Sequence, residues 1–210
     1  FSTPEGLPNS MVHQVYQDRD GYIWIPTFYG LFRYDGYEVR TYKSNLYTPG
    51  LLVNNNVLCV EEDYSHRLWI GTHEGLCMLD KRTGKMKKLQ LDGVSKQRLN
   101  EIHVTKENRV YLGYIRGMAY YDEMQDTLAL MTRKNCRGDV PESVNIQTLF
   151  EDVNGDLLIG TWKDGLYRYC IKENTFLHYP PLDEENSVLA LFQDSRGVMW
   201  IGTSGSGLYK

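Results

Sequence analysis

The sequence predicts an all-β protein, a β-propeller made of four-stranded antiparallel blades. A phrase of thirteen residues recurs at positions 23–35, 68–80, 110–122, 157–169 and 198–210, and its clearest copy reads LWIGTHEGLCMLD. The anchors of successive copies are 45, 42, 47 and 42 residues apart: Trp24, Trp69, Tyr111, Leu158 and Trp200. Short segments that alternate apolar and polar side chains, repeated at a period of about 44 residues without sustained helical periodicity, are typical of propeller blades.

Each repeat divides into four predicted strands. The first alternates and ends in an acid, as in VHQVYQD (12–18), VLCVEED (57–63), IQTLFED (146–152) and VLALFQD (188–194). A tight turn follows, in which Asp, Asn and Gly supply side-chain capping and positive φ. The second strand carries the anchor, the third resembles GLYRYD, and the fourth is variable. The predicted blades span 12–43, 57–91, 99–133, 146–179 and 188–210, the last incomplete.

Three residue types recur for reasons of packing. Glycines in the second strand are expected where neighbouring blades approach closely: Gly71, Gly160 and Gly202. The following threonines are expected to satisfy the turn into the third strand with their hydroxyls: Thr72, Thr161 and Thr203. Glycines that close this hairpin are expected at positive φ: Gly75, Gly165 and Gly207. Tryptophans in the second strand are expected to pack as wedges between sheets: Trp24, Trp69 and Trp200.

Two repeats deviate from this pattern. Pro26 replaces the strand glycine of the first repeat and removes a ladder donor, which predicts a bulge in that strand. The third repeat lacks the turn acid and has Tyr111 in place of the tryptophan and Tyr114 in place of the threonine. We therefore expect the third blade to be the least regular one.

Composition and missing motifs argue against several classes of function. The net charge of −4 provides no basic footprint for nucleic acid or an anionic membrane. The chain lacks an apolar run of about 18 residues, so no membrane-inserted segment is predicted. It also lacks a phosphate loop, a nucleophile elbow, a zinc motif and a complete calcium loop, so we expect no catalytic residue, metal or cofactor. Phe1 is neither an initiator Met nor part of a signal peptide, which predicts a cut or processed N-terminus.

The four cysteines show no CxxC spacing. We expect small, buried or half-buried apolar side chains at Cys59, Cys77, Cys136 and Cys170. Cys59 and Cys77 fall in one repeat, and a disulfide between them stays open because pairing does not follow from sequence.

The repeat count allows two interpretations of the architecture. Phe1 matches the last residue of a fourth strand, so the N-terminus could close a five-bladed ring. Alternatively, the chain is an arc of a larger ring. A single residue makes a poor closing strand, and we favour the arc.

Two phrases, GLPNSMVHQVYQDRDGYIWIPTFYGLFRYDG (6–36) and VLALFQDSRGVMWIGTSGSGLYK (188–210), resemble the regulator-propeller repeat of bacterial two-component sensors. The resemblance extends over essentially the whole chain, in four good copies and one poor one. It implies a typically seven-bladed propeller on the periplasmic side of a hybrid two-component histidine kinase. Such sensors, common in gut Bacteroidetes, respond to breakdown products of polysaccharides. The chain would then be one piece of a sensor whose membrane helix, kinase and receiver lie elsewhere.

The loops that join the second and third strands form the predicted ligand site. They vary while their flanks repeat, which is the expected division between a binding site and its rigid frame. Trp162 could stack on a sugar ring while Lys163 or Arg116 pairs with a carboxylate or sulfate. The predicted ligand-binding residues are Tyr29, His73, Glu74, Arg116, Trp162, Lys163 and Asp164. The alternative is that these residues are ordinary solvated loop tips, and the adjacent His73 and Glu74 indicate an exposed turn rather than acid–base chemistry.

These observations favour a non-catalytic, periplasmic sensor module that binds a polysaccharide-derived oligosaccharide or supports the domain that does. The resemblance further implies the remaining blades of the parent chain and a homodimer of the parent sensor as partners. Two alternatives stay open. One is a non-signalling scaffold for protein interactions. The other is a propeller lyase or glycosidase, which the scattered positions of the five histidines disfavour.

Overall fold

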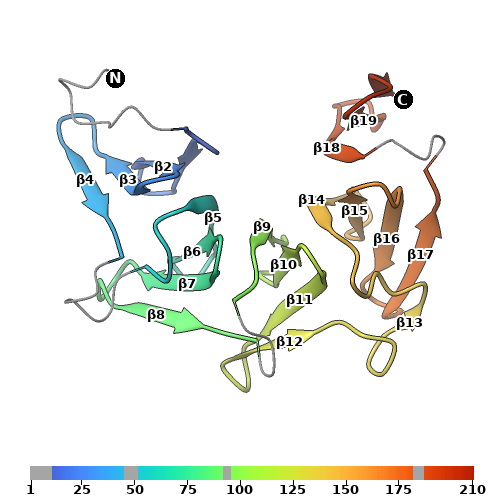
Figure 1. Ribbon diagram of the computed structural model, residues 1–210, viewed down its shortest axis with the longest axis horizontal. Helices are drawn as coiled ribbons and strands as arrows, with labels where there is room; N and C mark the ends of the chain where they lie inside the picture. Colours follow the sequence, from blue (N-terminus) through green and yellow to red (C-terminus); the bar gives the residue numbers. More distant parts are fainter. Residues whose placement is uncertain (1–10, 45–51, 92–95, 182–186) are drawn as a thin grey trace. The chain divides into compact units, whose positions relative to one another are not determined.

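The computed structural model describes residues 11–44, 52–91, 96–181 and 187–210, and every helix or strand within these ranges is a β-strand (Figure 1). The chain divides into two compact units, Phe1–Val104 and Thr105–Lys210. Phe1, the candidate for a closing strand, lies outside the described residues. Within those residues, no helix has the length and apolar character that crossing a membrane requires.

The first unit contains two four-stranded antiparallel sheets with the strands in sequence order. The first sheet consists of β1 (Tyr16–Gln17), β2 (Ile23–Thr27), β3 (Gly30–Tyr34) and β4 (Val39–Tyr42). The second consists of β5 (Val57–Glu62), β6 (Arg67–Thr72), β7 (Gly75–Asp80) and β8 (Met86–Leu89). The unit ends with β9 (Leu99–Val104), which begins the third sheet.

The second unit holds the other strands of the third sheet and two further sheets. The third sheet continues with β10 (Val110–Tyr114), β11 (Gly117–Asp122) and β12 (Thr127–Leu130). The fourth sheet consists of β13 (Arg137–Gly138), β14 (Ile146–Glu151), β15 (Leu157–Thr161), β16 (Leu166–Cys170) and β17 (Thr175–Tyr179). The fifth sheet consists of β18 (Val188–Gln193), β19 (Met199–Thr203) and β20 (Leu208–Tyr209). The short β13, which the sequence did not predict, pairs in parallel with β17.

The recurring acid after each first strand holds both the turn and the tryptophan. Asp63 Oδ1 accepts hydrogen bonds from the backbone N–H groups of Ser65 (2.8 Å) and Arg67 (3.0 Å), and Asp63 Oδ2 accepts from Trp69 Nε1 (2.9 Å). Equivalent tryptophan bonds join Asp18 to Trp24 at 2.8 Å and Asp194 to Trp200 at 3.2 Å. Trp24 and Trp69 are buried and Trp200 is partly exposed. The predicted turn role of the acid is therefore correct, and the bond to the tryptophan is a second role.

The expectation that the third blade is the least regular is wrong. Its sheet has four strands of four to six residues, and every residue of β10 is buried. Thr105 replaces the turn acid, and its Oγ1 accepts a hydrogen bond from the Arg109 N–H at 3.1 Å. Tyr111 has no indole N–H, so a second carboxylate oxygen is not needed at this turn. The two departures from the pattern compensate each other.

The predicted bulge at Pro26 is also absent from the β2–β3 ladder, where Pro26 pairs with Leu31 in unbroken register. The irregularity lies on the other side of β2. There, β1 is only two residues long, and Val12 meets Thr27 in an isolated bridge. Pro26 accepts a hydrogen bond from His13 N–H at 2.9 Å but has no N–H to return one. The lost donor therefore shortens the neighbouring strand instead of bending β2.

The predicted roles of the threonines and of the hairpin glycines are confirmed. The predicted close approach of neighbouring sheets is confirmed at Gly71 and Gly160 but not at Gly202, where a Cβ would meet only Ala190 of its own sheet, 3.4 Å from Ala190 Cβ. The threonine hydroxyl donates to the carbonyl of the hairpin glycine at 2.8 Å for Thr72–Gly75 and at 2.7 Å for Thr161–Gly165. The hairpin glycines have φ of 141° (Gly75), 73° (Gly165) and 78° (Gly207). A Cβ on the strand glycine Gly71 would lie 2.4 Å from Cys59 Sγ and 2.9 Å from Leu99 Cδ2 in β9. A glycine is therefore needed at position 71, where the second and third sheets pack against each other.

All four cysteines are free thiols, two buried and two half-buried, as the sequence predicted. Burial raises the pKa of the Cys77 thiol to about 11 and that of Cys59 well above its ordinary value. A high thiol pKa disfavours the reactive thiolate, so these two cysteines act as packing residues.

Candidate functional site

The predicted ligand-binding residues stand on hairpins whose bases are fixed by hydrogen bonds. His73 N–H donates to the Asn56 carbonyl and Trp162 N–H donates to the Asn145 carbonyl, both at 2.9 Å. Together with the threonine–glycine bonds, these contacts tie each hairpin to the segment that leads into its own sheet. The tips are thus presented by a rigid frame, which favours binding because little ordering is required.

In the first unit the tips carry aromatic and charged groups in separate loops. Tyr29 is 53% exposed and contacts the ring of Phe28 edge-on at a centroid distance of 5.3 Å. Glu74 forms an ion pair with Lys96 at 2.9 Å, and the hydrogen bond from Lys96 lowers the pKa of the Glu74 carboxyl. His73 is exposed. An ionised Glu74 paired to a lysine is a poor proton donor, which agrees with the turn interpretation.

In the second unit the structure groups Trp162, Lys163 and Asp164 on one tip. Trp162 is 47% exposed, and Lys163 adopts a positive φ of 62° while its N–H donates to Ser187 Oγ at 3.1 Å. Asp164 is engaged in the frame, because its carboxylate accepts a hydrogen bond from Tyr167 Oη at 2.6 Å. Burial, followed by the Asp164 contact, raises the pKa of Tyr167. The side chains of Trp162 and Lys163 are thus the exposed groups of this tip.

Arg116 lies on a different hairpin of the second unit, between β10 and β11, and is exposed. Within the described residues, no hydrogen bond connects Arg116 to Trp162. The structure therefore places Arg116 on a tip of the same kind but does not bring it into the Trp162 loop.

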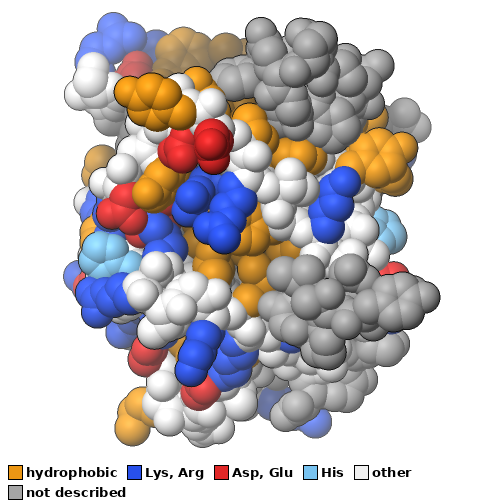
Figure 2. Space-filling view, turned by 90° about the vertical axis from the view of Figure 1, so that its left-hand side faces the viewer, with side chains coloured by type: hydrophobic (Ala, Val, Ile, Leu, Met, Phe, Trp, Pro, Cys, Tyr) orange, Lys and Arg blue, Asp and Glu red, His pale blue; other side chains and the backbone are white. Residues whose placement is uncertain are grey.

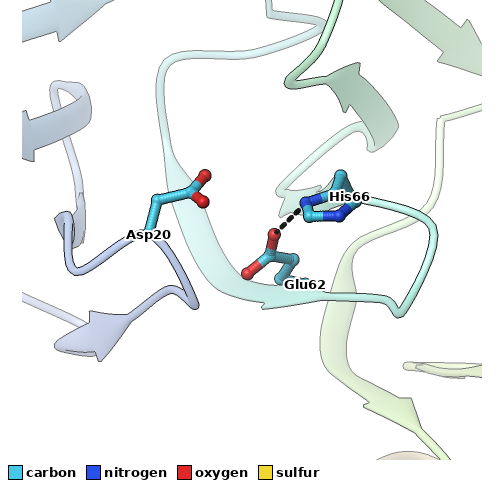
Figure 3. Close-up of side chains that lie close together, drawn as sticks. All are labelled: Asp20, Glu62 and His66. Atoms are coloured by element: carbon cyan, nitrogen blue, oxygen red, sulfur yellow. Dashed lines mark ion pairs between the residues drawn. The ribbon is translucent and has the colours of Figure 1, made fainter.

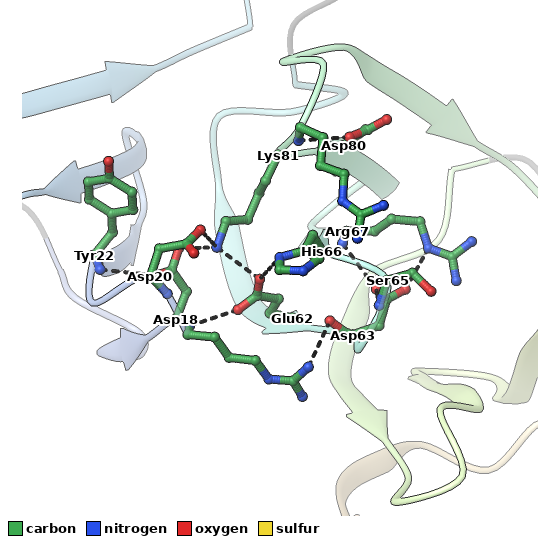
Figure 4. Close-up of polar contacts among 12 residues, drawn as sticks. Asp18, Asp20, Tyr22, Glu62, Asp63, Ser65, His66, Arg67, Asp80 and Lys81 are labelled. Atoms are coloured by element: carbon green, nitrogen blue, oxygen red, sulfur yellow. Dashed lines mark hydrogen bonds and ion pairs between the residues drawn. The ribbon is translucent and has the colours of Figure 1, made fainter.

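A cluster that the sequence did not predict joins the first two sheets. Asp20, Glu62 and His66 each offer a potential metal-ligand atom, and these atoms lie within 4.8 Å of one another (Figure 3). The Lys81 ammonium lies among their oxygens, 2.6 Å from Asp20, 2.8 Å from Glu62 and 2.7 Å from the Asp18 carboxylate (Figure 4). Lys81 thus takes the position at which these carboxylates would bind a cation.

Electrostatics at this cluster favour the ammonium. Burial alone would lower the pKa of Lys81, but hydrogen bonds from Lys81 to Asp18, Asp20 and Glu62 outweigh burial and raise it. The hydrogen bond from Lys81 in turn lowers the pKa of Asp20. A charged network of this kind links the two sheets structurally. It was missed because its members come from two repeats, and no single repeat holds a ligand spacing.

Two acids on neighbouring first strands have unusual protonation. Glu61 on β5 and Glu101 on β9 are partly buried, and burial raises the pKa of each carboxyl to about 8. Glu61 Oε2 also accepts a hydrogen bond from the Val104 N–H at 3.0 Å. This bond satisfies a backbone donor on the open edge of β9 and gives the buried acid a structural role.

Comparison with known proteins identifies the repeat. The model of the two component regulator propeller family matches residues 6–25, 51–74 and 183–205. The chain carries two component regulator propeller repeats. Each matched segment includes a turn acid and its tryptophan: Asp18 and Trp24, Asp63 and Trp69, and Asp194 and Trp200. Curated protein sequences give no match to the chain.

Solved structures share the fold. The extracellular domain of a hybrid two component system of B. thetaiotaomicron superposes with a TM-score of 0.83 at 22% identity, over 100% of this chain and 30% of that one. The extracellular domain of a one component system of the same organism gives a TM-score of 0.62 at 22% identity, over 97% of this chain and 32% of that one. The chain thus spans about a third of each.

A lyase also shares the architecture. Virginiamycin B lyase of Staphylococcus aureus, a catalytically inactive H270A form with quinupristin, matches with a TM-score of 0.75 at 12% identity, over 97% of this chain and 66% of that one. Likeness at such identities establishes the fold, and the all-β propeller prediction is confirmed. The segments that match the regulator propeller model coincide with the turn acids and tryptophans of the first, second and fifth repeats.

Proposed function

We propose that this chain is the ligand-sensing part of a two component sensor, located in the periplasm, and that it carries no catalytic centre. The family match to regulator propeller repeats is the observation that carries the proposal. The extracellular domains of Bacteroides sensors with the same fold support both the role and the location. In this proposal the relay across the membrane and any histidine kinase activity belong to other parts of the parent protein.

The proposed ligand is an oligosaccharide released from a polysaccharide, bound at the hairpin tips. Trp162 offers an exposed aromatic face, and Lys163 beside it offers a cation for a carboxylate or sulfate. Tyr29 offers a second exposed ring in the first unit. Because the hairpins are fixed at their bases, binding would act by favouring one packing arrangement of the parent sensor, as a homodimer, over another.

A thermal-shift screen of the intact sensor region against polysaccharide digests, followed by calorimetry on any hit, tests this proposal. A ligand present at 100 times its dissociation constant should stabilise the fold by about 2.7 kcal/mol. Trp162→Ala and Lys163→Ala should weaken binding, whereas Asp164→Asn should weaken it less because Asp164 is bound by Tyr167.

The outcomes separate the candidate functions. Binding unaffected by Trp162→Ala, Lys163→Ala and Arg116→Ala would move the ligand away from these hairpins and leave the chain a supporting frame. A complete absence of small-molecule binding would favour the protein-interaction scaffold. Turnover of a digest by the intact region would contradict the non-catalytic proposal.

A further inference from the structure

An arginine pair in the first sheet has no acidic partner within the part of the chain that the structure describes. Arg33 on β3 lies directly opposite Arg40 on β4, and Trp24 on β2 is the next residue in the same cross-strand row. Like charges placed directly opposite each other in a sheet are destabilising. Among the described residues neither arginine forms an ion pair, and the buried Arg33 Nε has no hydrogen-bond partner. A buried donor without a partner also costs stability.

The repeats supply an internal comparison. The residues at the position of Arg33 are Met78, Tyr120 and Arg168 in the second, third and fourth sheets, and those at the position of Arg40 are Lys87, Ala129 and Leu177. Among the described sheets with a fourth strand, only the first opposes two arginines. Arg168 in the fourth sheet has a carboxylate partner, since it donates to Asp156 at 2.8 Å through Nη2 and at 3.1 Å through Nε.

The repeat position that holds Asp156 holds Tyr22 in the first sheet, because each lies four residues after its turn acid. The Arg33 guanidinium consequently lies over the Tyr22 ring, 4.2 Å from its centroid, instead of on a carboxylate. The first repeat thus retains the arginine and lacks its anionic partner.

Both arginines line a cavity of about 530 Å³ between the first two sheets. Its walls also include the rings of Tyr22, Trp24 and Tyr42. The one acid in the lining, Asp20, is paired with Lys81 at 2.6 Å. Figure 2, which faces the side of the molecule that carries the first sheet, shows Lys and Arg side chains next to hydrophobic ones. The cavity is within the size range of small-molecule sites, which combine apolar walls with a few polar groups.

We propose that this cavity binds a small organic anion, separately from the hairpin-tip site. A carboxylate, sulfate or phosphate group accepts hydrogen bonds from Arg33 and Arg40, for which planar guanidinium groups are well suited. The carbon frame of the ligand lies against the rings of Tyr22 and Tyr42. The anion pairs with Arg33 as Asp156 pairs with Arg168, and its negative charge offsets the repulsion between Arg33 and Arg40.

Calorimetric titration of the intact protein at constant ionic strength tests the proposal with four probes: glucuronate, inorganic sulfate, inorganic phosphate and neutral glucose. We expect glucuronate to bind more tightly than either inorganic anion, because its ring contacts the aromatic walls, and glucose not to bind at this cavity. Arg33→Met and Arg40→Ala, which introduce the residues found at these places in the second and third repeats, should each weaken glucuronate binding roughly 10- to 100-fold.

Two controls keep the result specific. Arg168→Met removes an arginine from the same repeat position in another sheet and should leave anion binding unchanged. Thermal unfolding without ligand should show Arg33→Met to be at least as stable as the unmodified protein, so a loss of binding is not a loss of folding. Trp162→Ala should not affect this site, which keeps it distinct from the hairpin tips.

Failure of all anions to bind, or binding unchanged in Arg33→Met and Arg40→Ala, would overturn the proposal. Inorganic sulfate or phosphate binding as tightly as glucuronate would overturn the role of the aromatic walls. Weakening in Arg168→Met equal to that in Arg33→Met would show a general charge effect and would also overturn it.

Discussion

At the scale of single residues, the turn acid combines two tasks that can be separated by substitution. Asp63→Asn keeps an oxygen for the backbone N–H groups of Ser65 and Arg67. It points an NH₂ group at the two donors that the native Oδ2 serves, Trp69 Nε1 at 2.9 Å and Arg67 Nε at 2.6 Å. We expect a loss of about 2–3 kcal/mol in the free energy of unfolding, since the buried Trp69 donor and the Arg67 guanidinium both lose their acceptor.

Asp35→Asn is the matched control for this prediction. Asp35 Oδ1 accepts from the N–H groups of Tyr37 and Glu38, and an asparagine oxygen can accept the same bonds. Urea denaturation of both variants measures the difference, and Asp35→Asn should be close in stability to the unmodified protein. Equal losses in the two variants would show that the contacts of Asp63 Oδ2 with Trp69 and Arg67 contribute nothing.

The strand glycines provide a second residue-scale prediction. A Cβ at Gly160 would lie 2.6 Å from Thr148 Cγ2 and 2.9 Å from the Val188 backbone oxygen, whereas a Cβ at Gly202 would meet Ala190 Cβ at 3.4 Å. Gly160→Ala should therefore destabilise the protein by about 1–3 kcal/mol through overpacking, and Gly202→Ala should have little effect. Denaturant unfolding compares them, and similar losses would contradict the close approach of β18 to β15.

At the scale of strands and sheets, the sequence predicted what is encoded within one repeat. Alternation gave the strands, and the positions of Asp, Thr and Gly gave the turns. The parallel strand β13 was missed because its two residues, Arg137 and Gly138, show no alternation and form a strand only by pairing with β17. The effect of Pro26 was predicted for its own strand, β2. It appears instead in the neighbouring first strand, because that strand has no N–H donor opposite it at Pro26.

The first strands also carry the two acids whose protonation couples folding to pH. Burial raises the pKa of Glu61 and Glu101 to about 8 from a usual value near 4.5. Between these two values the folded chain retains protons that the unfolded chain has released, so the contribution of these acids to stability falls as pH rises from about 5 to 8 and levels off above 8. The slope is at most about 1.4 kcal/mol per pH unit for each carboxyl.

Thermal or urea unfolding across this pH range measures the effect. Glu61→Gln and Glu101→Gln should each flatten the profile, because a neutral amide does not titrate. Glu107→Gln, at a side chain that is 68% exposed, serves as the control and should leave the slope unchanged. A slope insensitive to both buried substitutions would show that these carboxyls are ionised in the folded protein.

At the scale of the whole molecule, the hairpin tips were predictable and the clusters between sheets were not. A loop that varies between constant flanks can be recognised by aligning the repeats with one another, as at Trp162 and Lys163. The cluster around Lys81 and the cavity lined by Arg33 and Arg40 each combine residues about one period apart. The sequence does not show which side chains of successive repeats meet, because this depends on how the sheets pack.

The Lys81 cluster connects the first and second sheets. Its removal therefore tests how much the contact between neighbouring repeats contributes to the free energy of unfolding. Lys81→Met keeps the apolar stem but leaves the carboxylates of Asp18, Asp20 and Glu62 without their ammonium partner. We expect a loss of about 3–5 kcal/mol, since breaking a buried ion pair leaves charge uncompensated.

Calcium should restore part of this stability in the variant only, because carboxylate oxygens are its preferred ligands and Lys81 no longer occupies their centre. Lys85→Met, at an exposed lysine four residues further along the chain, is the control and should neither destabilise the protein nor create a response to calcium. Thermal unfolding with and without calcium measures both effects. A calcium response of the same size in the unmodified protein would mean that the cation does not need the position of the ammonium.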